Sequence, residues 1–426
     1  MSDEQTSTVE ASGGIDAPVD KANRIDSLDF IRGIAVMGIL WANIVAFGQP
    51  MQAYMYPDAF LVPANDQGNW MWIVQFVLID GKMRGLFTLL FGAGMYLFLA
   101  KAWERGSGIG LQARRLFWLL LFGLVHFFFI WRGDILVNYA LCGFVALLFV
   151  RMAAKNQLIL GIVGYVAGCF LYALLMATPY LFAESSLSEN PMFADSVTEL
   201  EAGKADDIAD GVAEAAIIGE GRYGDFVAHN FTEHGTEPFV FVMLWMFETI
   251  PLILIGMALY RMGLFNGGFD RAKQMRWGWI GIVAGVVLTV PIALWGASTG
   301  PSYYGSLAAF MGLSPLPRLP MILGLAALLA LLGASANGWL GQRIKAAGRA
   351  AFSNYLGTSI VMLLVFHGFA GGLFGELDRP QLYIVVVATW VLMLLWSKPW
   401  LERFRFGPLE WLWRCLTYGK LFPLKR

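Results

Sequence analysis

The sequence predicts an all-α, polytopic integral membrane protein, a bundle of about ten transmembrane helices with both termini cytoplasmic. Of the 426 residues only 14% are charged, against about 25% in a typical soluble domain. Hydrophobic residues make up 58% of the chain, and the mean hydropathy is +0.60. A water-soluble protein of this size cannot bury that much apolar surface, so the composition excludes an ordinary soluble enzyme.

Charge and cysteine content narrow the class further. The net charge is −1, whereas a nucleic-acid-binding protein carries a basic stripe, so we expect no nucleic-acid partner. The three cysteines lie far apart and outside any Cys-x-x-Cys pattern, which argues against a disulfide framework or a structural zinc site. We therefore expect no metal, and membrane lipid as the surrounding partner.

A membrane-spanning helix needs about 20 mostly apolar residues, and ten segments meet or approach this length. The 70–100 stretch is too long for one straight helix and contains Asp80-Gly81-Lys82, so we expect 70–79 to be an outer or re-entrant piece before a span that starts near 83. The third, fourth, eighth and tenth segments are a little short and need flanking residues. The ten segments are 30–47, 70–100, 116–131, 135–150, 157–182, 239–260, 277–297, 319–333, 352–374 and 381–396.

The distribution of Lys and Arg sets the orientation through the positive-inside rule. With the N-terminus inside and strict alternation, 23 of these residues fall in cytoplasmic segments and five in outside segments. We therefore expect transmembrane helices over 30–182 and 239–397. Residues 1–29 are expected to form a disordered acidic cytoplasmic tail, and residues 398–426 a basic cytoplasmic tail.

One long segment, 184–237, lies outside the predicted spans and is placed on the extracytoplasmic side by this topology. It carries thirteen acidic residues against Lys204 and Arg222. Acidic segments with few aromatic residues rarely pack into a core, so we expect a solvated, partly disordered loop. The alternative is a substrate lid, because the end of the segment is rich in polar functional groups.

Polar side chains inside spans are costly unless they have a partner, and they are functional-site candidates for that reason. The alternative is a hydrogen bond between helices that only assembles the bundle. Arg32 and Asn43 are eleven positions apart in the first span, which is about three helical turns. Both therefore lie on one helix face, with Asn43 about 16 Å deeper than Arg32.

A histidine lies at a similar depth in the third predicted span. His126 is about 16 Å from Arg115 along the helix axis, and Asp134 follows eight residues later. Asp134 is positioned to orient the imidazole, whose pKa near neutrality suits general-base catalysis. Packing is the competing interpretation of this histidine.

Glu248 lies at about mid-depth, with Lys82 or Arg84 as expected partners. No nucleotide-binding, zinc-protease or serine-hydrolase motif is present in the sequence. The glycines of Phe91-Gly-Ala-Gly94 and of Gly348-Arg-Ala-Ala are expected at close helix contacts, not in phosphate-binding loops.

Several segments resemble the bacterial YeiB-like membrane proteins, which carry domain of unknown function 418. The resemblance covers about 24–420 apart from the acidic segment. The first matching motif begins at Arg24-Ile-Asp-Ser-Leu-Asp-Phe-Ile-Arg-Gly and extends to Asn43, and the second is Asp80-Gly-Lys-Met-Arg-Gly-Leu-Phe. The third consists of His126 and Trp131-Arg-Gly-Asp-Ile-Leu. The fourth begins at Gly348-Arg-Ala-Ala-Phe-Ser-Asn-Tyr355, includes Trp400-Leu-Glu-Arg-Phe-Arg-Phe-Gly-Pro-Leu-Glu-Trp-Leu-Trp-Arg, and ends at Gly419.

This resemblance implies the bacterial inner (cytoplasmic) membrane and a distant relation to transmembrane acyltransferases, including heparan-glucosaminide acetyltransferase. Those relatives move an acyl group from cytoplasmic acyl-CoA to an acceptor on the far side. Their first span carries an Arg followed eleven positions later by His or Asn, and Arg32 with Asn43 fits the Asn version. The heparan enzyme has its catalytic His in the next loop, whereas residues 48–69 here contain no His. Either His126 takes the role of base, or the chemistry differs, or there is none.

On this interpretation acetyl-CoA is the expected co-substrate, and an envelope glycan, lipid or small molecule is the acceptor. Asn43 would hold the thioester carbonyl or the oxyanion, and His126, oriented by Asp134, would be the base. The CoA phosphates would be bound by Arg32 with Arg114, Arg115 or Arg349. The expected acceptor pocket contains Asp80, Lys82, Arg84, Glu248 and Asn354.

Two other classes of function remain open from the sequence. One is a solute transporter in which Glu248, Lys82 and His126 form a proton relay. The other is a structural or regulatory membrane protein in which these polar groups only connect helices.

Overall fold

The computed structural model describes residues 25–62, 66–298 and 302–426, and within these ranges it contains helices and no β-strand. The all-α prediction is confirmed. The first helix, α1 (Asp26–Gly48), begins earlier than expected, so the last residues of the predicted 1–29 tail are helical. Asp26 and Asp29 lie in its first turn, where carboxylates interact favourably with the helix dipole. Residues 1–24 lie outside the described residues.

Each of the ten predicted segments contains a helix. Among the described residues eight helices are long and apolar enough to cross a membrane, or nine if one bent pair counts as a single span. The remaining predicted segment holds α5 (Leu136–Leu147), whose 12 residues rise only about 18 Å, against about 30 Å of hydrocarbon. The eight helices long enough to cross a membrane are α1, α2 (Asp66–Leu78) continued by α3 (Lys82–Glu104), α4 (Ile109–Phe129), α6 (Ala154–Glu184), α9 (Glu237–Met262), α10 (Arg271–Ser298), α12 (Pro315–Ser335) and α15 (Arg379–Arg403).

The predicted interruption of the second span is confirmed. A short break separates α2 from α3, and Gly81 in it has a φ of 72°, a left-handed conformation that favours glycine. A Cβ at this position would also lie 2.4 Å from the Arg318 side chain. Glycine at this position therefore allows both the change of direction and the close approach of α12.

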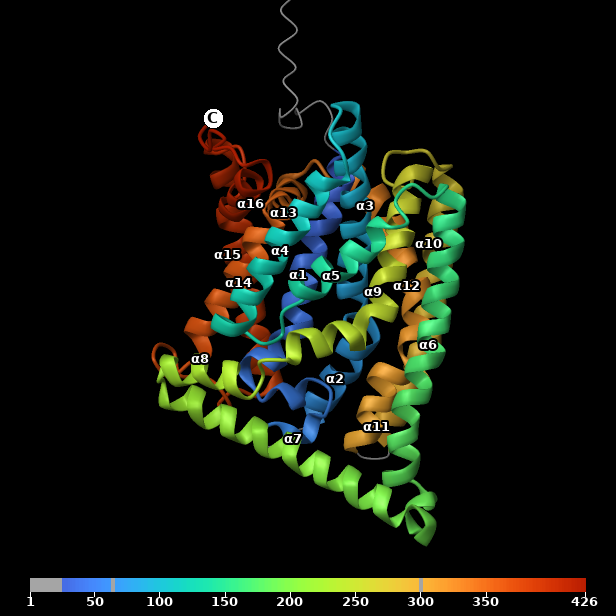
Figure 1. Ribbon diagram of the computed structural model, residues 1–426, viewed down its shortest axis with the longest axis vertical. Helices are drawn as coiled ribbons and strands as arrows, with labels where there is room; N and C mark the ends of the chain where they lie inside the picture. Colours follow the sequence, from blue (N-terminus) through green and yellow to red (C-terminus); the bar gives the residue numbers. More distant parts are fainter. Residues whose placement is uncertain (1–24, 63–65, 299–301) are drawn as a thin grey trace, which may run out of the picture.

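The bent pair consists of α13 (Trp339–Arg349) and α14 (Ala351–Phe366), which meet at 86°. Helix α13 packs on α1, and Lys345 of α13 forms an ion pair of 3.1 Å with Asp26. The C-terminal helix α16 (Pro408–Tyr418) lies at the same end of the bundle, together with the C-terminus (Figure 1). We call this the terminal end, and the positive-inside rule predicts that it faces the cytoplasm.

Helix packing in the bundle depends on close backbone contacts at glycines, as predicted for Gly92 and Gly348. A Cβ at Gly92 would lie 2.1 Å from the Ile253 carbonyl oxygen. Gly256, which was not predicted, makes a similar contact. Helix α3 packs on α9, and a Cβ at Gly256 would lie 1.9 Å from the Leu89 carbonyl oxygen. Helix α1 packs on α13, and a Cβ at Gly348 would lie 1.7 Å from the Asp29 carbonyl oxygen. These distances are far below van der Waals contact, so a larger residue requires the helices to separate.

The acidic segment 184–237 is not the partly disordered loop that its composition suggested. It forms α7 (Ala194–Glu220) and α8 (Tyr223–Thr232), preceded by the short helices Ser186–Glu189 and Pro191–Phe193. Frequent alanine favours a helix here, and tertiary hydrogen bonds anchor it to the bundle. Helix α7 runs across the end of the bundle opposite the C-terminus (Figure 1), and we call this the α7 end.

Two sets of contacts hold this pair of helices on the bundle. Gln52, in the short helix Met51–Tyr54, donates to the Asp207 carbonyl of α7 at 2.7 Å. Asn230 of α8 donates to the carbonyl of Phe128 at 3.1 Å, near the end of α4. The segment therefore forms an ordered cap over the α7 end.

Candidate functional site

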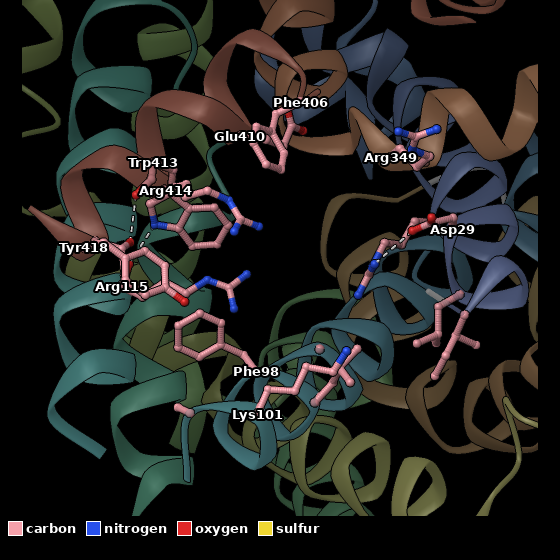
Figure 2. Close-up of a pocket in the computed structure, with 18 of the residues that line it drawn as sticks. Asp29, Phe98, Lys101, Arg115, Arg349, Phe406, Glu410, Trp413, Arg414 and Tyr418 are labelled. Carbon is pink, nitrogen blue, oxygen red and sulfur yellow. Dashed lines mark hydrogen bonds and ion pairs between the residues drawn. The ribbon is translucent and has the colours of Figure 1, made fainter. Parts of the chain in front are cut away.

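A cavity of about 260 Å³ opens at the terminal end, and we call it the basic vestibule. Figure 2 shows Arg115 and Arg414 on one wall, with Arg349 and Asp29 across the cavity. Among its lining residues are two acidic side chains, Asp29 and Glu410, and six cationic ones. The six cationic residues are Arg32, Lys101, Arg105, Arg115, Arg349 and Arg414. They come from α1, the C-terminal end of α3, α4, α13 and α16.

Three of the four predicted phosphate-binding arginines line this cavity: Arg32, Arg115 and Arg349. The fourth, Arg114, does not, and it donates to the Thr417 carbonyl at 3.4 Å. Successive residues of a helix point about 100° apart, so only one of two adjacent arginines can face the cavity. Lys101, Arg105 and Arg414 were not expected as site residues, although they lie at or near helix ends on the side predicted to be cytoplasmic.

Aromatic side chains fix the orientation of one guanidinium in the vestibule, that of Arg115. The guanidinium of Arg115 lies 4.7 Å from the Phe98 ring centre and 4.2 Å from that of Trp413. Planar guanidinium groups stack on aromatic faces in this way. Arg115 is therefore held in place before any ligand binds.

The vestibule adjoins a smaller cavity of about 180 Å³, which we call the inner chamber. Arg32, Arg115 and Arg349 line both cavities, and the inner chamber extends to Tyr139 and Tyr355. Most of its other lining residues are apolar or aromatic. A charged entrance thus leads to a smaller, largely apolar compartment.

Glu410 lies where the vestibule meets the inner chamber. Its carboxylate accepts hydrogen bonds from the backbone N–H groups of Phe352 at 2.7 Å and Ser353 at 3.1 Å, in the first turn of α14. Burial raises the pKa of Glu410, and the hydrogen bonds from Ser353 and Phe352 act in the opposite direction. Glu410 thus attaches α16 to α14 beside the arginines.

A separate cavity of about 200 Å³, the outer chamber, lies toward the α7 end. Its polar lining residues include Asn43, Arg84, Asp134 and Asn138, and its aromatic ones include Trp131. Arg32 and Asn43 lie on the same helix, as predicted, but they line different cavities. Asn138, which the sequence analysis did not select, is an intramembrane amide, and that is the signal that could have found it.

The wall between the two chambers contains His126. Leu136 and Tyr139 face the inner chamber, whereas Ile135 and Asn138 face the outer one. The imidazole of His126 lies close to Tyr355, at a ring-centre distance of 5.3 Å. The histidine is fully buried, so it lies within the wall itself.

The structure brings His126 and Asp134 together, as expected from the sequence. Their Nδ1 and Oδ1 atoms are 2.8 Å apart, and Asp134 Oδ2 accepts from the backbone N–H of Val137 at 2.8 Å. A proton on Nδ1 leaves Nε2 with a free lone pair. Among the described residues Nε2 has no hydrogen-bond partner. The pair is thus an oriented imidazole with an unused basic nitrogen.

Of the five residues expected in an acceptor pocket, Arg84 lines the outer chamber. Its guanidinium is 2.5 Å from Glu248, which is also 3.7 Å from the guanidinium of Arg318. Arg84 is therefore the partner predicted for Glu248. Arg318 is buried and belongs to this cluster.

The other two charged residues in this set interact with nearby groups. The Lys82 ammonium donates to the Phe76 carbonyl at 2.6 Å, and Asp80 accepts from Gln75 at 3.0 Å. Both side chains are buried, and they stabilise the break between α2 and α3.

Asn354, also expected in the acceptor pocket, is not among the residues that line the vestibule, the inner chamber or the outer chamber. Its amide nitrogen donates to Ala347 and to Ser397, and its oxygen accepts from Trp396 at 2.9 Å. These hydrogen bonds tie α13, α14 and α15 together, which is the helix-assembling role of intramembrane amides.

The comparisons with known proteins agree with the resemblance. Residues 259–420 match the family described as "Protein of unknown function (DUF418)". The chain is 30% identical to the uncharacterized protein YxaH of Bacillus subtilis (strain 168), covering 95% of this chain and 96% of YxaH. It is also 30% identical to the uncharacterized protein YeiB of Escherichia coli (strain K12), covering 93% and 97%. No solved structure matches. With near-complete coverage of both relatives, the chain belongs to the YeiB-like family of membrane proteins, whose function is unknown.

Proposed function

We propose that this protein is an inner-membrane acyltransferase that moves an acyl group, expected to be acetyl, from cytoplasmic acyl-CoA to an extracytoplasmic acceptor. The observation that carries the proposal is the basic vestibule, whose cationic side chains lie at the entrance to a smaller chamber lined by Tyr355, the neighbour of His126. The acceptor class is an envelope glycan, lipid or small molecule carrying a hydroxyl or amine.

The vestibule suits the charged part of CoA. The 3′-phosphate and the pyrophosphate are anions that arginine recognises through forked hydrogen bonds. Arg32, Arg115 and Arg349 line both the vestibule and the inner chamber, so the phosphates would bind at the entrance. The slim pantetheine arm would then extend between apolar and aromatic side chains toward Tyr139 and Tyr355.

Transfer would take place at the wall between the chambers. The acceptor O–H or N–H would give its proton to His126 Nε2 while its oxygen or nitrogen bonds to the thioester carbon. The tetrahedral intermediate would then expel the CoA thiolate, which takes up the proton. Asn43 would donate to the oxyanion. Because His126 is fully buried, the side chains of the wall must part for the acceptor to reach it.

Ligand-dependent thermal unfolding of the purified protein tests the proposal. Acetyl-CoA at 100 times its dissociation constant should stabilise the folded state by about 2.7 kcal/mol. Acetyl-pantetheine, which lacks the phosphates, should have far less effect. An unchanged unfolding temperature in millimolar acetyl-CoA would refute the proposal.

Matched arginine variants locate the binding site. Arg115→Ala and Arg32→Ala should weaken acetyl-CoA binding by at least about tenfold, since hydrogen bonds to charged groups contribute about 1.5–3 kcal/mol. Arg114→Ala is the control, because Arg114 is not among the lining residues of the vestibule and donates to the backbone carbonyl of Thr417. Equal effects at positions 114 and 115 would contradict the placement of the phosphates.

A solute transporter is the second candidate, favoured by the presence of two cavities on either side of a closed wall. The relay of Glu248, Lys82 and His126 considered from the sequence is not supported by the hydrogen bonds, because Lys82 donates to a backbone carbonyl and Glu248 lies between two arginines. Gradient-driven flux in proteoliposomes without acyl-CoA would favour this candidate.

A further inference from the structure

Three side chains with metal-ligating atoms converge at the α7 end, outside both chambers. Asp210 lies on α7, His229 on α8, and His234 between α8 and α9. The Nε2 atoms of the two histidines are 3.3 Å apart, and Asp210 Oδ1 is 3.8 Å from the first and 3.6 Å from the second. No two residues of this set are sequence neighbours, so the site forms only when the cap folds.

These distances fit the coordination sphere of a small divalent metal. Zinc binds imidazole nitrogen at about 2.0–2.1 Å and carboxylate oxygen at about 2.0–2.2 Å, in tetrahedral geometry. Neighbouring ligand atoms in such a sphere lie about 3.3–3.5 Å apart. The three observed separations are within a few tenths of an ångström of this range, so little movement is needed to bind the ion.

A fourth residue prepares one of the histidines for ligation. His234 Nδ1 lies 2.9 Å from Glu237 Oε1, so Nδ1 carries the proton and the lone pair is on Nε2. Metal-binding histidines commonly donate their second nitrogen to a carboxylate in this way. His234 is also almost fully buried, which holds the ring in this orientation.

The charge balance also points to a divalent cation. Arg132 lies among Asp210, Glu214 and Glu237, with separations of 3.7, 2.9 and 3.6 Å. Three carboxylates and one guanidinium leave two negative charges when the histidines are neutral. Arg132 Nη1 is 2.5 Å from His234 Nε2, so a cation already occupies the space beside the ligand nitrogen. Because Arg132 Nη2 also bonds Glu214, the guanidinium has an alternative partner when Nη1 is displaced.

We propose that Asp210, His229 and His234 bind a divalent transition metal of the Zn²⁺ class, with Glu237 orienting His234 and the remaining coordination position taken by water. Two histidines and one carboxylate are a donor set that Zn²⁺ and similar ions prefer. The metal joins α7 to the segment after α8 and takes His234 Nε2 from Arg132. This proposal uses residues outside the acyl-CoA site and does not depend on the proposed function. It replaces the sequence-based expectation of no metal.

Zinc titration of the full-length protein in detergent, after removal of metal with a chelator, tests the site. We expect one Zn²⁺ per chain by calorimetry and elemental analysis, with a rise in unfolding temperature on binding. Asp210→Asn and His229→Gln should abolish stoichiometric binding. Asp206→Asn is the matched control, because it lies four residues earlier on α7 with an exposed side chain, and it should bind like the wild type.

Glu237, which bonds the ligand His234, provides a test in which binding should weaken but not disappear. Glu237→Gln should weaken Zn²⁺ binding by about 10–100-fold, the usual effect of losing such a supporting carboxylate. The wild-type titration alone can overturn the proposal, even if a variant fails to fold: no saturable binding near one equivalent means there is no site. Unchanged Zn²⁺ binding in folded Asp210→Asn and His229→Gln proteins would overturn it as well.

Discussion

Substitution of His126 by glutamine separates an enzyme from a structural membrane protein. The imidazole is fully buried and bonded to Asp134 through Nδ1. Glutamine has similar volume and an N–H group that can donate to the same carboxylate, but it has no nitrogen that can accept a proton near neutral pH. The change therefore keeps the hydrogen bond and removes only the base.

The two possible roles of His126 predict effects of different kinds. If the residue only packs, alanine should destabilise the protein by about 1–3 kcal/mol, because Asp134 Oδ1 loses its donor in a buried place. If His126 is the base, glutamine should lower the rate by about 10²–10⁴-fold. That loss equals about 2.7–5.4 kcal/mol of activation free energy, with little change in unfolding.

The assay follows thiol release from acetyl-CoA, by transfer or by hydrolysis, alongside thermal unfolding and acetyl-CoA binding. We expect His126→Gln to fold and bind acetyl-CoA but lose activity, and Asp134→Asn to show a milder defect of the same kind. A folded, fully active His126→Gln protein would refute the assignment of the base. Failure of the glutamine variant to fold, with alanine no worse, would favour the packing role.

The remaining predictions concern packing, charge and topology. Gly256→Ala should destabilise the protein by about 1–3 kcal/mol through overpacking. The control is Gly357→Ala, at a helix glycine with no atom within 4 Å of the added Cβ, which should be neutral or stabilising by up to about 1 kcal/mol. Equal unfolding temperatures of the two variants would contradict the packing argument. Glu248→Gln should lower the free energy of unfolding by about 3–5 kcal/mol, because its two arginine partners keep their charges in a buried site. Chemical unfolding in detergent measures this change. An unchanged free energy of unfolding would show that the ion pairs contribute little. In a background without the native cysteines, an impermeant maleimide should label Ser186→Cys in intact cells and Asn266→Cys only after permeabilisation; equal labelling of both would contradict the topology.

The positions of the helices follow from hydropathy, and the local pairings follow from the cost of polar groups in a membrane. The break at Gly81, the Arg84–Glu248 pair and the His126–Asp134 contact were all expected on these grounds. Each involves a short sequence separation or a strong energetic demand that leaves few alternatives.

The structure differs from expectation where sequence patterns alone do not determine tertiary contacts. Asn354, like Asn43, is an amide within a predicted span, but its hydrogen-bond partners lie on neighbouring helices. Only the packing of the helices shows this difference between the two residues. Arg114 and Arg115 are adjacent and chemically equal, so helix rotation decides which one faces the vestibule. The acidic segment was interpreted from its charge, whereas its alanine content and its contacts with the bundle determine its structure.

The cap has a consequence for the molecules that reach the outer face. Helix α7 carries eight acidic residues and only Lys204 as a basic one, and it packs on the short helix whose residues line the outer chamber. A surface of this sign concentrates cations and depletes anions, over a distance of about 8 Å at physiological ionic strength. A phosphorylated acceptor would approach against this potential, while an amino sugar or a neutral alcohol would not, so added salt should speed the arrival of anionic acceptors selectively.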